Sequence, residues 1–437
     1  MRTAIGLSIL LGTCLTQTAT AQTDVARADA AVRAFMAKEG IPAAHVTILR
    51  GDAVILQRGY GSAGANGRVP DESTIFPLGS ISKQFTAAAI VALANAGKVR
   101  LDARVGEYLP EWFANEPDLL VSHLLSQTSG LQDFLWLEGY RPLADAPETP
   151  VAAYVALAAS APRRFPPGTR WSYSNTNYKV LALIAERVTG ERFDRVLADL
   201  VLSPAGIEGI VSCHSLRPDQ FVPGVSAKGK PTPLDASAAA YVGDGGLCSS
   251  AGPLTRWIRL VLAARDGDAS RLARPSQLAD GTQVPYGFGL STRAFGSHDM
   301  VWHSGNVDSH STMIAFVPDA DLGVVILTNK GYVWLTELMP ALIGDTPAAS
   351  HAAATAPPLS GRFEDGLFRF DVRREGRALR VNIDLIDTLR FIPAGPREYV
   401  AEAYPATFRI RLPADGSRDR FEFEWGEVRS YARRVKP

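Results

Sequence analysis

The sequence has no excess of charge of either sign. Its 45 lysine and arginine residues match its 45 aspartate and glutamate residues, so the formal net charge at pH 7 is zero. A surface without a net field does not concentrate nucleic acid or an anionic membrane around it. We therefore expect no nucleic-acid partner. The length of 437 residues allows one large domain and a small second one.

Long apolar runs are absent beyond the N-terminus, and we expect no stable insertion into a membrane. At the N-terminus, Arg2 precedes a mostly apolar run from Ala4 to Leu15, and Ala19-Thr20-Ala21 follows as a small-x-small cleavage site. This run is too short to span a bilayer comfortably but is typical of a signal peptide. We predict a signal peptide over residues 1–21 and export to the periplasm or the medium. An ordinary N-terminal helix is the alternative.

Cysteine is scarce, with three residues in the chain. Cleavage of the predicted signal peptide removes Cys14 and leaves Cys213 and Cys248. Two thiols in an oxidising compartment can pair, and neither lies in a His, Cys and acid cluster with the spacing of a metal site. We predict a Cys213–Cys248 disulfide and no metal. The alternative is a pair of buried free thiols.

Several common catalytic motifs are also missing. The sequence has no G-x-S-x-G, the nucleophile turn of α/β-hydrolases, and no H-E-x-x-H of zinc proteases. A G-x-G-x-x-G run does occur from Gly59 to Gly64, but Asn66, Gly67 and Pro70 follow it. A dinucleotide site needs a helix to begin there, with its N-terminus toward the pyrophosphate. We therefore reject a dinucleotide site in this run.

Apolar patterns outline the secondary structure of the main part of the chain. Residues 46–58 are typical of a hairpin, and residues 80–96 repeat apolar side chains at helical spacing before Gly97. The other expected elements are a helix over 176–188, strands over 309–317 and 323–328, and a last helix over 333–342. This order predicts an α/β body over residues 22–344 whose sheet takes strands from both ends of the chain.

The C-terminal part has a different pattern. Residues 345–358 are rich in Ala, Thr and Pro without periodicity, as in a linker. Residues 359–437 then alternate apolar and polar side chains in four runs, of which Phe368, Phe370 and Val372 form the first. Alternation with period two is the pattern of half-buried strands. We predict a small antiparallel β-sandwich or barrel.

Three short motifs carry chemically useful side chains. Ser80-Ile81-Ser82-Lys83 places a hydroxyl and an amine three residues apart on one face of a helix. Ser80 lies where that helix begins, and free N–H groups there favour developing negative charge. A serine needs a base to become a nucleophile, and Lys83 can serve only if burial lowers its pKa.

The other two motifs follow later in the chain. Tyr173-Ser174-Asn175 lies in a Pro/Gly-rich loop before a helix, and His303-Ser304-Gly305 follows the expected strand 300–302. A tyrosine beside an ammonium group can exchange protons, and a glycine leaves room for a substrate to approach the backbone. Taken singly, Ser80, Tyr173 and His303 could each be purely structural. The ordered set favours a catalytic site.

The set resembles the serine β-lactamase and penicillin-binding protein superfamily. The similarity is greatest to the branch of class C β-lactamases, D-aminopeptidases, D-alanyl-D-alanine carboxypeptidases and related esterases. The S-x-x-K, Y-x-N and third-strand motifs occur in the family's order, and similar phrases surround them over roughly residues 25–343: PLGSISKQFTAAAI, VSHLLSQTSGL, FPPGTRWSYSNTNY, DGGLCSSAGPLTRW, YGFGL and FVPDADLGVVILTN. The resemblance implies an antiparallel sheet flanked by helices, with a helical subdomain.

The resemblance also implies the roles of the residues. Ser80 would form an acyl-enzyme, and Lys83 and Tyr173 would move protons. Asn175 would bind the substrate amide, while His303 and Gly305 would line the substrate site. The backbone N–H groups of Ser80 and Asn306 would hold the oxyanion.

One position departs from the β-lactamase pattern. His303 stands where β-lactamases usually carry lysine, whose permanent charge helps to hold a substrate carboxylate. An imidazole titrates near pH 6.5, so we expect protonation of His303 within the working range to alter the binding of carboxylate-bearing substrates.

This departure favours an exported peptidase for D-amino-acid-containing peptides, acting without a cofactor on a peptide or small-molecule substrate. A carboxylesterase comes second and a β-lactamase third. The alternative from another class is an inactive binding protein on the same scaffold. The sequence gives no indication of the oligomeric state.

Overall fold

The structure is a computed structural model, and no helix among its described residues is long and apolar enough to cross a membrane. The predicted signal peptide and residues 345–355 of the predicted linker lie outside the described residues. The described ranges are 25–63, 67–140, 149–233, 242–263, 268–284, 286–295, 298–344, 356–364, 368–383, 387–402, 408–425 and 428–435.

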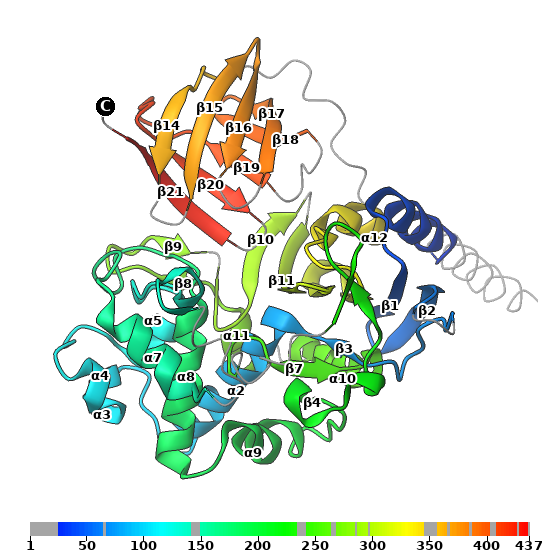
Figure 1. The fold of residues 1–437 in the computed structure, drawn as a ribbon, viewed down its shortest axis with the longest axis vertical. Helices are drawn as coiled ribbons and strands as arrows, with labels where there is room; N and C mark the ends of the chain where they lie inside the picture. Colours follow the sequence, from blue (N-terminus) through cyan, green and yellow to red (C-terminus); the bar gives the residue numbers. More distant parts are fainter. Residues whose placement is uncertain are drawn as a thin grey trace, which may run out of the picture.

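An antiparallel sheet of six strands forms the centre of the larger domain, in the order β10-β11-β12-β13-β1-β2 (Figure 1). Strands β1 and β13 pair with Val46 opposite Ile326, so segments far apart in the sequence are neighbours in mid-sheet. The predicted sheet with strands from both ends of the domain is confirmed. Its strands are β1 (Ala43–Arg50), β2 (Ala53–Gly61), β10 (Ser291–Phe295), β11 (His298–Val307), β12 (His310–Val317) and β13 (Leu322–Thr328).

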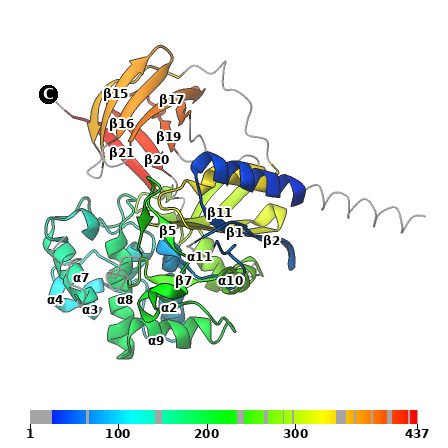
Figure 2. The same cartoon turned by 45° about the vertical axis from the view of Figure 1, so that its right-hand side comes forward.

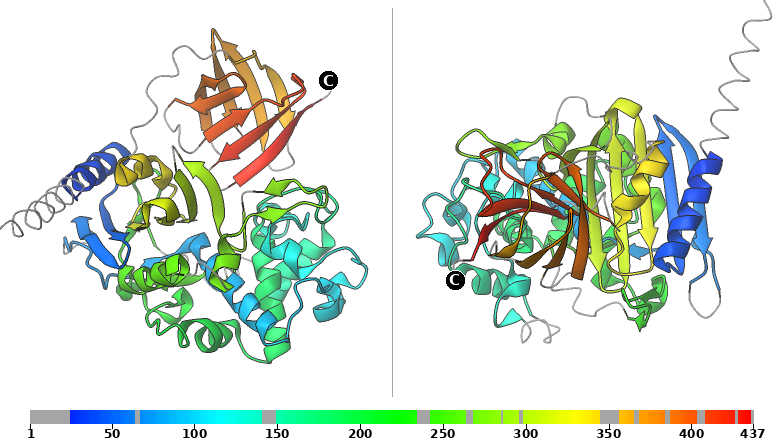
Figure 3. Two further views of the ribbon diagram at one scale, coloured as in Figure 1. Left: turned by 180° about the vertical axis from the view of Figure 1, so that it is seen from behind. Right: turned by 90° about the horizontal axis from the view of Figure 1, so that it is seen from above.

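Both faces of this sheet are covered. In β12, Met313, Ala315 and Val317 pack on one side, and Ile314 and Phe316 pack on the other. A helix over residues 25–39 lies with α12 on the first face, while α2 and α10 lie against the second (Figure 3). Because both faces are buried, the central strands are apolar throughout instead of alternating.

Most of the helices that lie between β3 and β10 in chain order form a second group beside the sheet (Figure 1). The predicted helix after Ser80 and the predicted helix before Gly190 are both present, and Gly190 ends the second one with a φ of 74°. The helical segments are η1 (Gly79–Ile81), α2 (Ser82–Asn95), α3 (Val105–Tyr108), α4 (Pro110–Phe113), α5 (Val121–Leu125), η2 (Phe134–Trp136), α7 (Val151–Ser160), α8 (Asn175–Thr189), α9 (Phe193–Leu197), η3 (Ala198–Leu202), η4 (Cys213–Ser215), η5 (Pro218–Gln220), α10 (Ala251–Ala263), α11 (Asp268–Ala273), η7 (Pro318–Ala320), η8 (Leu335–Leu338) and α12 (Met339–Ile343).

Two expectations for this domain need correction. The expected helix over 333–342 is divided into η8 and α12, with Pro340 in the first turn of α12. Proline has no N–H for a continuous helix, so it occurs at the start of a new one. The third motif does not follow a strand: His303, Ser304 and Gly305 lie within β11, which continues to Val307.

Small sheets complete the domain. The three-stranded sheet β3-β7-β4 packs directly behind the start of α2, where the Leu78 N–H donates to the Leu247 carbonyl at 2.8 Å. The short strands are β3 (Phe76–Pro77), β4 (Val211–Ser212), β5 (Gly224–Val225), β6 (Pro231–Thr232), β7 (Leu247–Ser249), β8 (Ser276–Gln277) and β9 (Gln283–Val284).

The C-terminal region is a closed barrel of eight antiparallel strands, which confirms the predicted small β domain. Its interior is apolar and rich in phenylalanine, as the alternating runs predicted. The sequence pattern did not reveal all of the strands, since β14 has four residues and β17 contains a bulge at Pro393. The strands are β14 (Gly361–Glu364), β15 (Arg369–Glu375), β16 (Ala378–Ile383), β17 (Asp387–Gly395), β18 (Glu398–Ala401), β19 (Phe408–Arg411), β20 (Arg420–Trp425) and β21 (Val428–Arg434).

Aromatic side chains join the barrel to the larger domain. The Trp334 ring centroid lies 5.6 Å from that of Trp425 and 5.2 Å from that of Phe408, both edge to face. Trp425 also packs against the cluster of Trp171 and Tyr286. The barrel therefore lies over the sheet and the helical group, as two views show (Figures 1 and 2).

A disulfide joins Cys213, in η4, to Cys248, in β7. Both residues are buried, and the bond closes a loop with a sequence separation of 35. It fixes the three-stranded sheet that packs behind Ser80.

We expect the double variant Cys213→Ala/Cys248→Ala to lose about 4 kcal/mol of unfolding free energy, because the crosslink restricts the unfolded chain. Urea unfolding of the variant, of the oxidised protein and of the reduced protein measures this loss. The reduced protein should match the variant. Equal stability of all three would contradict a stabilising disulfide.

Candidate active site

Ser80 lies in a tight turn that leads into α2. The turn is the single 3-10 turn η1, and Gly79 begins it with a φ of 53°. A side chain at such an angle is strained, so glycine suits this position. Ser80 itself is partly exposed, whereas Gly79 and Ile81 are buried. The hydroxyl is thus held on a rigid turn at the surface of a packed core.

The amine of Lys83 faces the Ser80 hydroxyl one turn further along α2. Lys83 is fully buried, and its Nζ lies 2.9 Å from Ser80 Oγ. The same Nζ donates to Asn175 Oδ1 and to the backbone carbonyl of Asp244, both at 2.7 Å. An ammonium group has three N–H bonds, so these three acceptors match its donors.

The side chain of Asn175 is held from behind by Asp133. The backbone N–H and the Nδ2 of Asn175 both donate to Asp133 Oδ2, at 2.9 and 2.8 Å. Burial raises the pKa of the Asp133 carboxyl. Since Nδ2 carries two hydrogens, one remains beyond the bond to Asp133 for a further acceptor. Asn175 thus positions Lys83 as well as lying at the site.

Tyr173 packs against the same amine. Lys83 Nζ lies 4.9 Å from the centre of the Tyr173 ring. The residues on both sides of Tyr173 are fixed by Gln127, whose carbonyl accepts from the Ser172 N–H at 2.9 Å and whose Oε1 accepts from the Ser174 N–H at 3.0 Å. Gln127 has a φ of 62°, a strained angle for a residue with a side chain. The strained residue Gln127 therefore holds both neighbours of Tyr173 in place.

The edge of β11 comes unusually close to the Ser80 turn. A Cβ on Gly305 would lie 1.9 Å from the Leu78 carbonyl oxygen, and one on Gly79 would lie 2.8 Å from the Asn306 backbone nitrogen. The two glycines are therefore required for this approach. Asn306 turns its side chain away, accepting from Ser311 Oγ at 2.8 Å. The backbone at Asn306 is thereby brought beside the turn that holds Ser80.

His303 is buried next to these groups, not poised at the solvent. Its Nδ1 lies 2.6 Å from the Ser304 carbonyl and its Nε2 lies 3.1 Å from the Tyr286 hydroxyl. A carbonyl only accepts, so Nδ1 carries the hydrogen and Nε2 accepts from Tyr286. Burial, with the nearby Lys83 charge, lowers the pKa of His303 to about 3. The expectation that His303 titrates within the working range is therefore wrong.

A second buried lysine lies behind the first. Lys179 Nζ pairs with Asp244 Oδ1 at 2.9 Å, and both side chains are almost fully buried. Burial lowers the pKa of Lys179, and the Asp244 charge opposes that shift. Because the carbonyl of Asp244 accepts from Lys83, this ion pair anchors one of the three acceptors of the Lys83 amine.

The structure thus brings Ser80, Lys83, Tyr173, Asn175 and the third motif together around one point. It also adds residues that sequence reasoning missed. Asp133 and Gln127 lie in the phrase SQTSGLQD, and Lys179 lies one helical turn after Asn175. Gln127, Asp244 and Tyr286 lie within the phrases VSHLLSQTSGL, DGGLCSSAGPLTRW and YGFGL, and Asp133 lies two residues after the first of them. The missed residues are Gln127, Asp133, Lys179, Asp244 and Tyr286.

Comparison with known proteins agrees with this arrangement. A family model described as Beta-lactamase matches residues 28–346. The chain belongs to the beta-lactamase family. The superfamily resemblance seen in the motifs is confirmed, and with it the class of serine hydrolases.

Curated relatives are D-aminopeptidases. The chain is 30% identical over 321 residues to the D-aminopeptidase of Gluconobacter oxydans (strain 621H), covering 70% of this chain and 59% of that protein. It is 27% identical over 384 residues to the D-aminopeptidase of Cereibacter sphaeroides (strain KD131), covering 85% and 72%. The chain thus spans about three fifths of the length of the Gluconobacter relative.

Solved structures share the fold. The structure of SurE superposes with a TM-score of 0.66 at 23% identity, covering 95% of this chain and 100% of that one. The D-alanine carboxypeptidase AmpC from Burkholderia cenocepacia gives a TM-score of 0.61 at 16% identity, covering 74% and 99%. The octameric penicillin-binding protein homologue from Pyrococcus abyssi gives 0.64 at 19% identity, covering 93% and 100%.

We expect Lys179→Met to cost about 3–5 kcal/mol of unfolding free energy, because it leaves the Asp244 carboxylate buried without its partner. The double variant Lys179→Met/Asp244→Asn should recover part of that loss. Arg195→Met, which breaks an exposed pair with Asp199, is the control and should cost at most about 1 kcal/mol. Equal losses of unfolding free energy for Lys179→Met and Arg195→Met, measured by urea unfolding, would contradict a stabilising role of the buried Lys179–Asp244 pair.

The low pKa of His303 predicts a pH dependence of stability. The imidazole has a pKa of about 3 in the folded state and 6.5 otherwise, so the folded state binds fewer protons between these values. The contribution of the neutral imidazole to the unfolding free energy is fully present above pH 6.5 and is lost as the pH falls toward 3. The unfolding free energy of the wild type should therefore fall more steeply with acidification than that of His303→Gln. Parallel profiles for the two proteins would refute a buried neutral imidazole.

Proposed function

We propose that the protein is an exported serine hydrolase that cleaves amide bonds of peptides containing D-amino acids, through an acyl-enzyme on Ser80. The observation that carries this proposal is the 2.9 Å contact between Lys83 Nζ and a partly exposed Ser80 Oγ, with Tyr173 against the same amine. The D-aminopeptidases among the relatives support the substrate class. The N-terminal pattern and the disulfide support export.

The acylation step needs an acceptor for the serine proton. Lys83 Nζ lies within hydrogen-bond distance of three acceptors, Ser80 Oγ included, which suits an ammonium that holds the serine oxygen. Tyr173 is then the better acceptor of the Ser80 proton, since a neighbouring positive charge favours a phenolate. Ser80 Oγ bonds to the substrate carbonyl carbon, the C–N bond breaks, and the proton passes to the leaving amine. Water then hydrolyses the ester and returns a proton to Ser80.

The negative charge that develops on the carbonyl oxygen needs donors at a fixed place. We assign these to the backbone N–H groups of Ser80 and Asn306, which the close contact of Gly79 with the backbone at Asn306 supports. The second Nδ2 hydrogen of Asn175 is available for a substrate carbonyl. His303 and Gly305 form the neighbouring wall. A neutral His303, whose two ring nitrogens bond to Ser304 and Tyr286, adds shape there but no charge.

A carboxylesterase is the second candidate. The same steps open an ester, in which the leaving group is an alcohol instead of an amine. A neutral His303 favours both of these activities over a β-lactamase, because it gives no permanent charge for the carboxylate of a β-lactam. An inactive binding protein is disfavoured by the intact contact between Lys83 and Ser80.

We expect Ser80→Ala to abolish hydrolysis of D-alanyl amides and p-nitrophenyl esters, while the thermal midpoint of unfolding stays close to that of the wild type. Lys83→Ala and Tyr173→Phe should each lower kcat by about a thousandfold or more, because each removes part of one catalytic unit. Ser160→Ala, an exposed serine at the end of α7, is the matched control. Labelling by a fluorophosphonate, read by mass spectrometry, should modify Ser80 in the wild type and Ser160→Ala alike. Turnover by Ser80→Ala at the wild-type rate would overturn the mechanism.

A further inference from the structure

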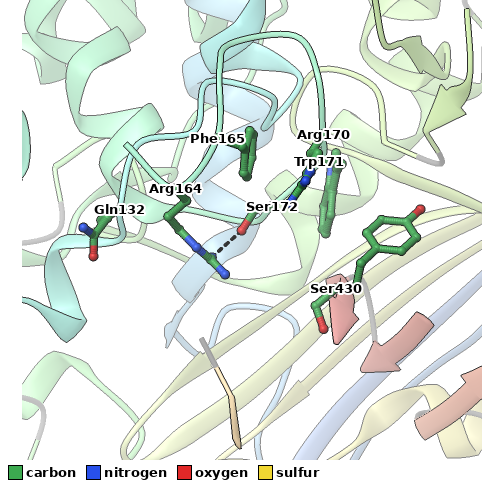
Figure 4. Close-up of a pocket in the computed structure, with 8 residues that line it drawn as sticks. Gln132, Arg164, Phe165, Arg170, Trp171, Ser172 and Ser430 are labelled. Carbon is green, nitrogen blue, oxygen red and sulfur yellow. Dashed lines mark hydrogen bonds between the residues drawn. The ribbon is translucent and has the colours of Figure 1, made fainter. Parts of the chain in front are cut away.

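A cavity of about 260 Å³ lies between the larger domain and the barrel, outside the catalytic group (Figure 4). Its walls come from two distant parts of the chain. One wall is the loop that precedes Tyr173, and the other is strand β21 of the barrel. The residues that matter for its chemistry are Arg164, Arg170, Trp171, Ser172, Ser430 and Tyr431.

Two arginines give the described lining of the cavity its charged groups. Arg164 and Arg170 both line it, and none of the described residues that line it is acidic. Arg164 Nη1 donates to Ser172 Oγ at 2.6 Å, which fixes the guanidinium against the wall (Figure 4). A guanidinium presents parallel N–H groups that match the two oxygens of a carboxylate. The charge and the donors both suit an anion.

Two buried polar atoms lack a partner in the same cavity. Trp171 is 4% exposed and Ser430 is 8% exposed, and Trp171 Nε1 and Ser430 Oγ have no hydrogen-bond partner among the described residues. Buried polar groups are normally paired, because an unsatisfied one costs free energy. The indole N–H can only donate, and the hydroxyl can donate. Each therefore leaves a donor without an acceptor in a residue of the cavity wall.

The volume limits the size of what binds. A cavity of 260 Å³ is smaller than a site for a whole drug-sized ligand but accommodates one carboxylate-bearing arm with a few waters. The cavity is thus a subsite for part of a larger molecule.

Its location connects it with the catalytic group. Trp171 and Ser172 come directly before Tyr173, and the Trp171 ring centroid lies 5.8 Å from that of Tyr286. Tyr286 in turn bonds to His303. Trp171 and Ser172 therefore line the cavity, while the next residue, Tyr173, belongs to the proposed catalytic group.

We propose that this cavity binds a carboxylate of the substrate, at a distance from the bond that Ser80 attacks. Arg164 and Arg170 pair with the carboxylate oxygens, and Trp171 Nε1 and Ser430 Oγ complete the set of donors. The proposal rests on the proposed function and narrows it to acidic peptides. It also places the recognition of substrate charge here and not at the neutral His303.

The test compares D-alanyl peptides that differ in one group, D-glutamate against D-glutamine, with the acidic residue one, two or three positions from the D-alanine. The wild type should prefer one glutamate peptide over its glutamine match. For that peptide, Arg164→Gln and Ser430→Asp should each lower kcat/KM by about tenfold to a hundredfold, the range of a charge-assisted hydrogen bond. The glutamine peptide should change by less than about twofold, as with a screened surface charge.

Matched controls separate this effect from a general loss of activity. Arg195→Gln removes an exposed arginine on α9, at the other end of the larger domain from the barrel (Figure 1), and should leave both peptides unaffected. Arg164→Lys should restore part of the preference. An equal loss for both peptides, or no preference in the wild type, would overturn the proposal.

Binding distinguishes the remaining outcomes. With Ser80→Ala, calorimetry should show tighter binding of the glutamate peptide, and Arg164→Gln in that background should remove the difference. This expected difference in binding does not depend on the proposed catalytic role of Ser80. If phosphate or succinate instead raises the thermal midpoint of the wild type but not of Arg164→Gln, and the peptides are not distinguished, the cavity serves a free oxyanion and the substrate proposal is wrong.

Discussion

One buried ammonium group holds the site together. Lys83 donates to Ser80 in the turn η1 just before its own helix, to Asn175 at a sequence separation of 92, and to the carbonyl of Asp244 at a separation of 161. A buried charge without partners is very costly, so these segments must meet for the chain to fold with Lys83 inside. Asp133 fixes one of these acceptors from behind, and the Lys179–Asp244 pair fixes another. The geometry of the candidate site and the folding of the chain therefore depend on the same bonds.

Close contacts of the backbone at two glycines provide the second constraint on the geometry of the site. Strand β10 pairs with β11 from His298 to Trp302 among the described residues. Beyond Trp302, one edge of β11 still pairs with β12, and its other edge comes close to the Ser80 turn. Gly79 and Gly305 permit that contact at distances that any Cβ would block. The approach is further fixed by Thr312, whose hydroxyl donates to the Leu78 carbonyl at 2.8 Å. A rigid sheet and a rigid turn thus meet where a substrate carbonyl would bind.

The barrel takes part in this site and is more than an appended domain. Trp425 packs in the cluster of Trp171 and Tyr286, and Ser430 and Tyr431 complete the arginine-lined cavity. Each of these barrel residues lies close to the loop around Tyr173 or to Tyr286, which bonds to His303. The proposed substrate subsite and the proposed proton transfer therefore use neighbouring residues of the same loop, held in place by Gln127.

The sequence by itself determined what depends on local spacing. A helix brings residues three apart onto one face, so Ser80 and Lys83 could be paired from the sequence, and alternation of period two predicted a small antiparallel β-sandwich or barrel. Only the tertiary structure decided the rest, because burial and contacts across many residues follow from packing. It made His303 a neutral buried imidazole, supplied Asp133 and Asp244 as anchors, and joined Arg164 to Ser430 in one cavity. No local pattern contains that information, since each of these properties belongs to residues that become neighbours only on folding.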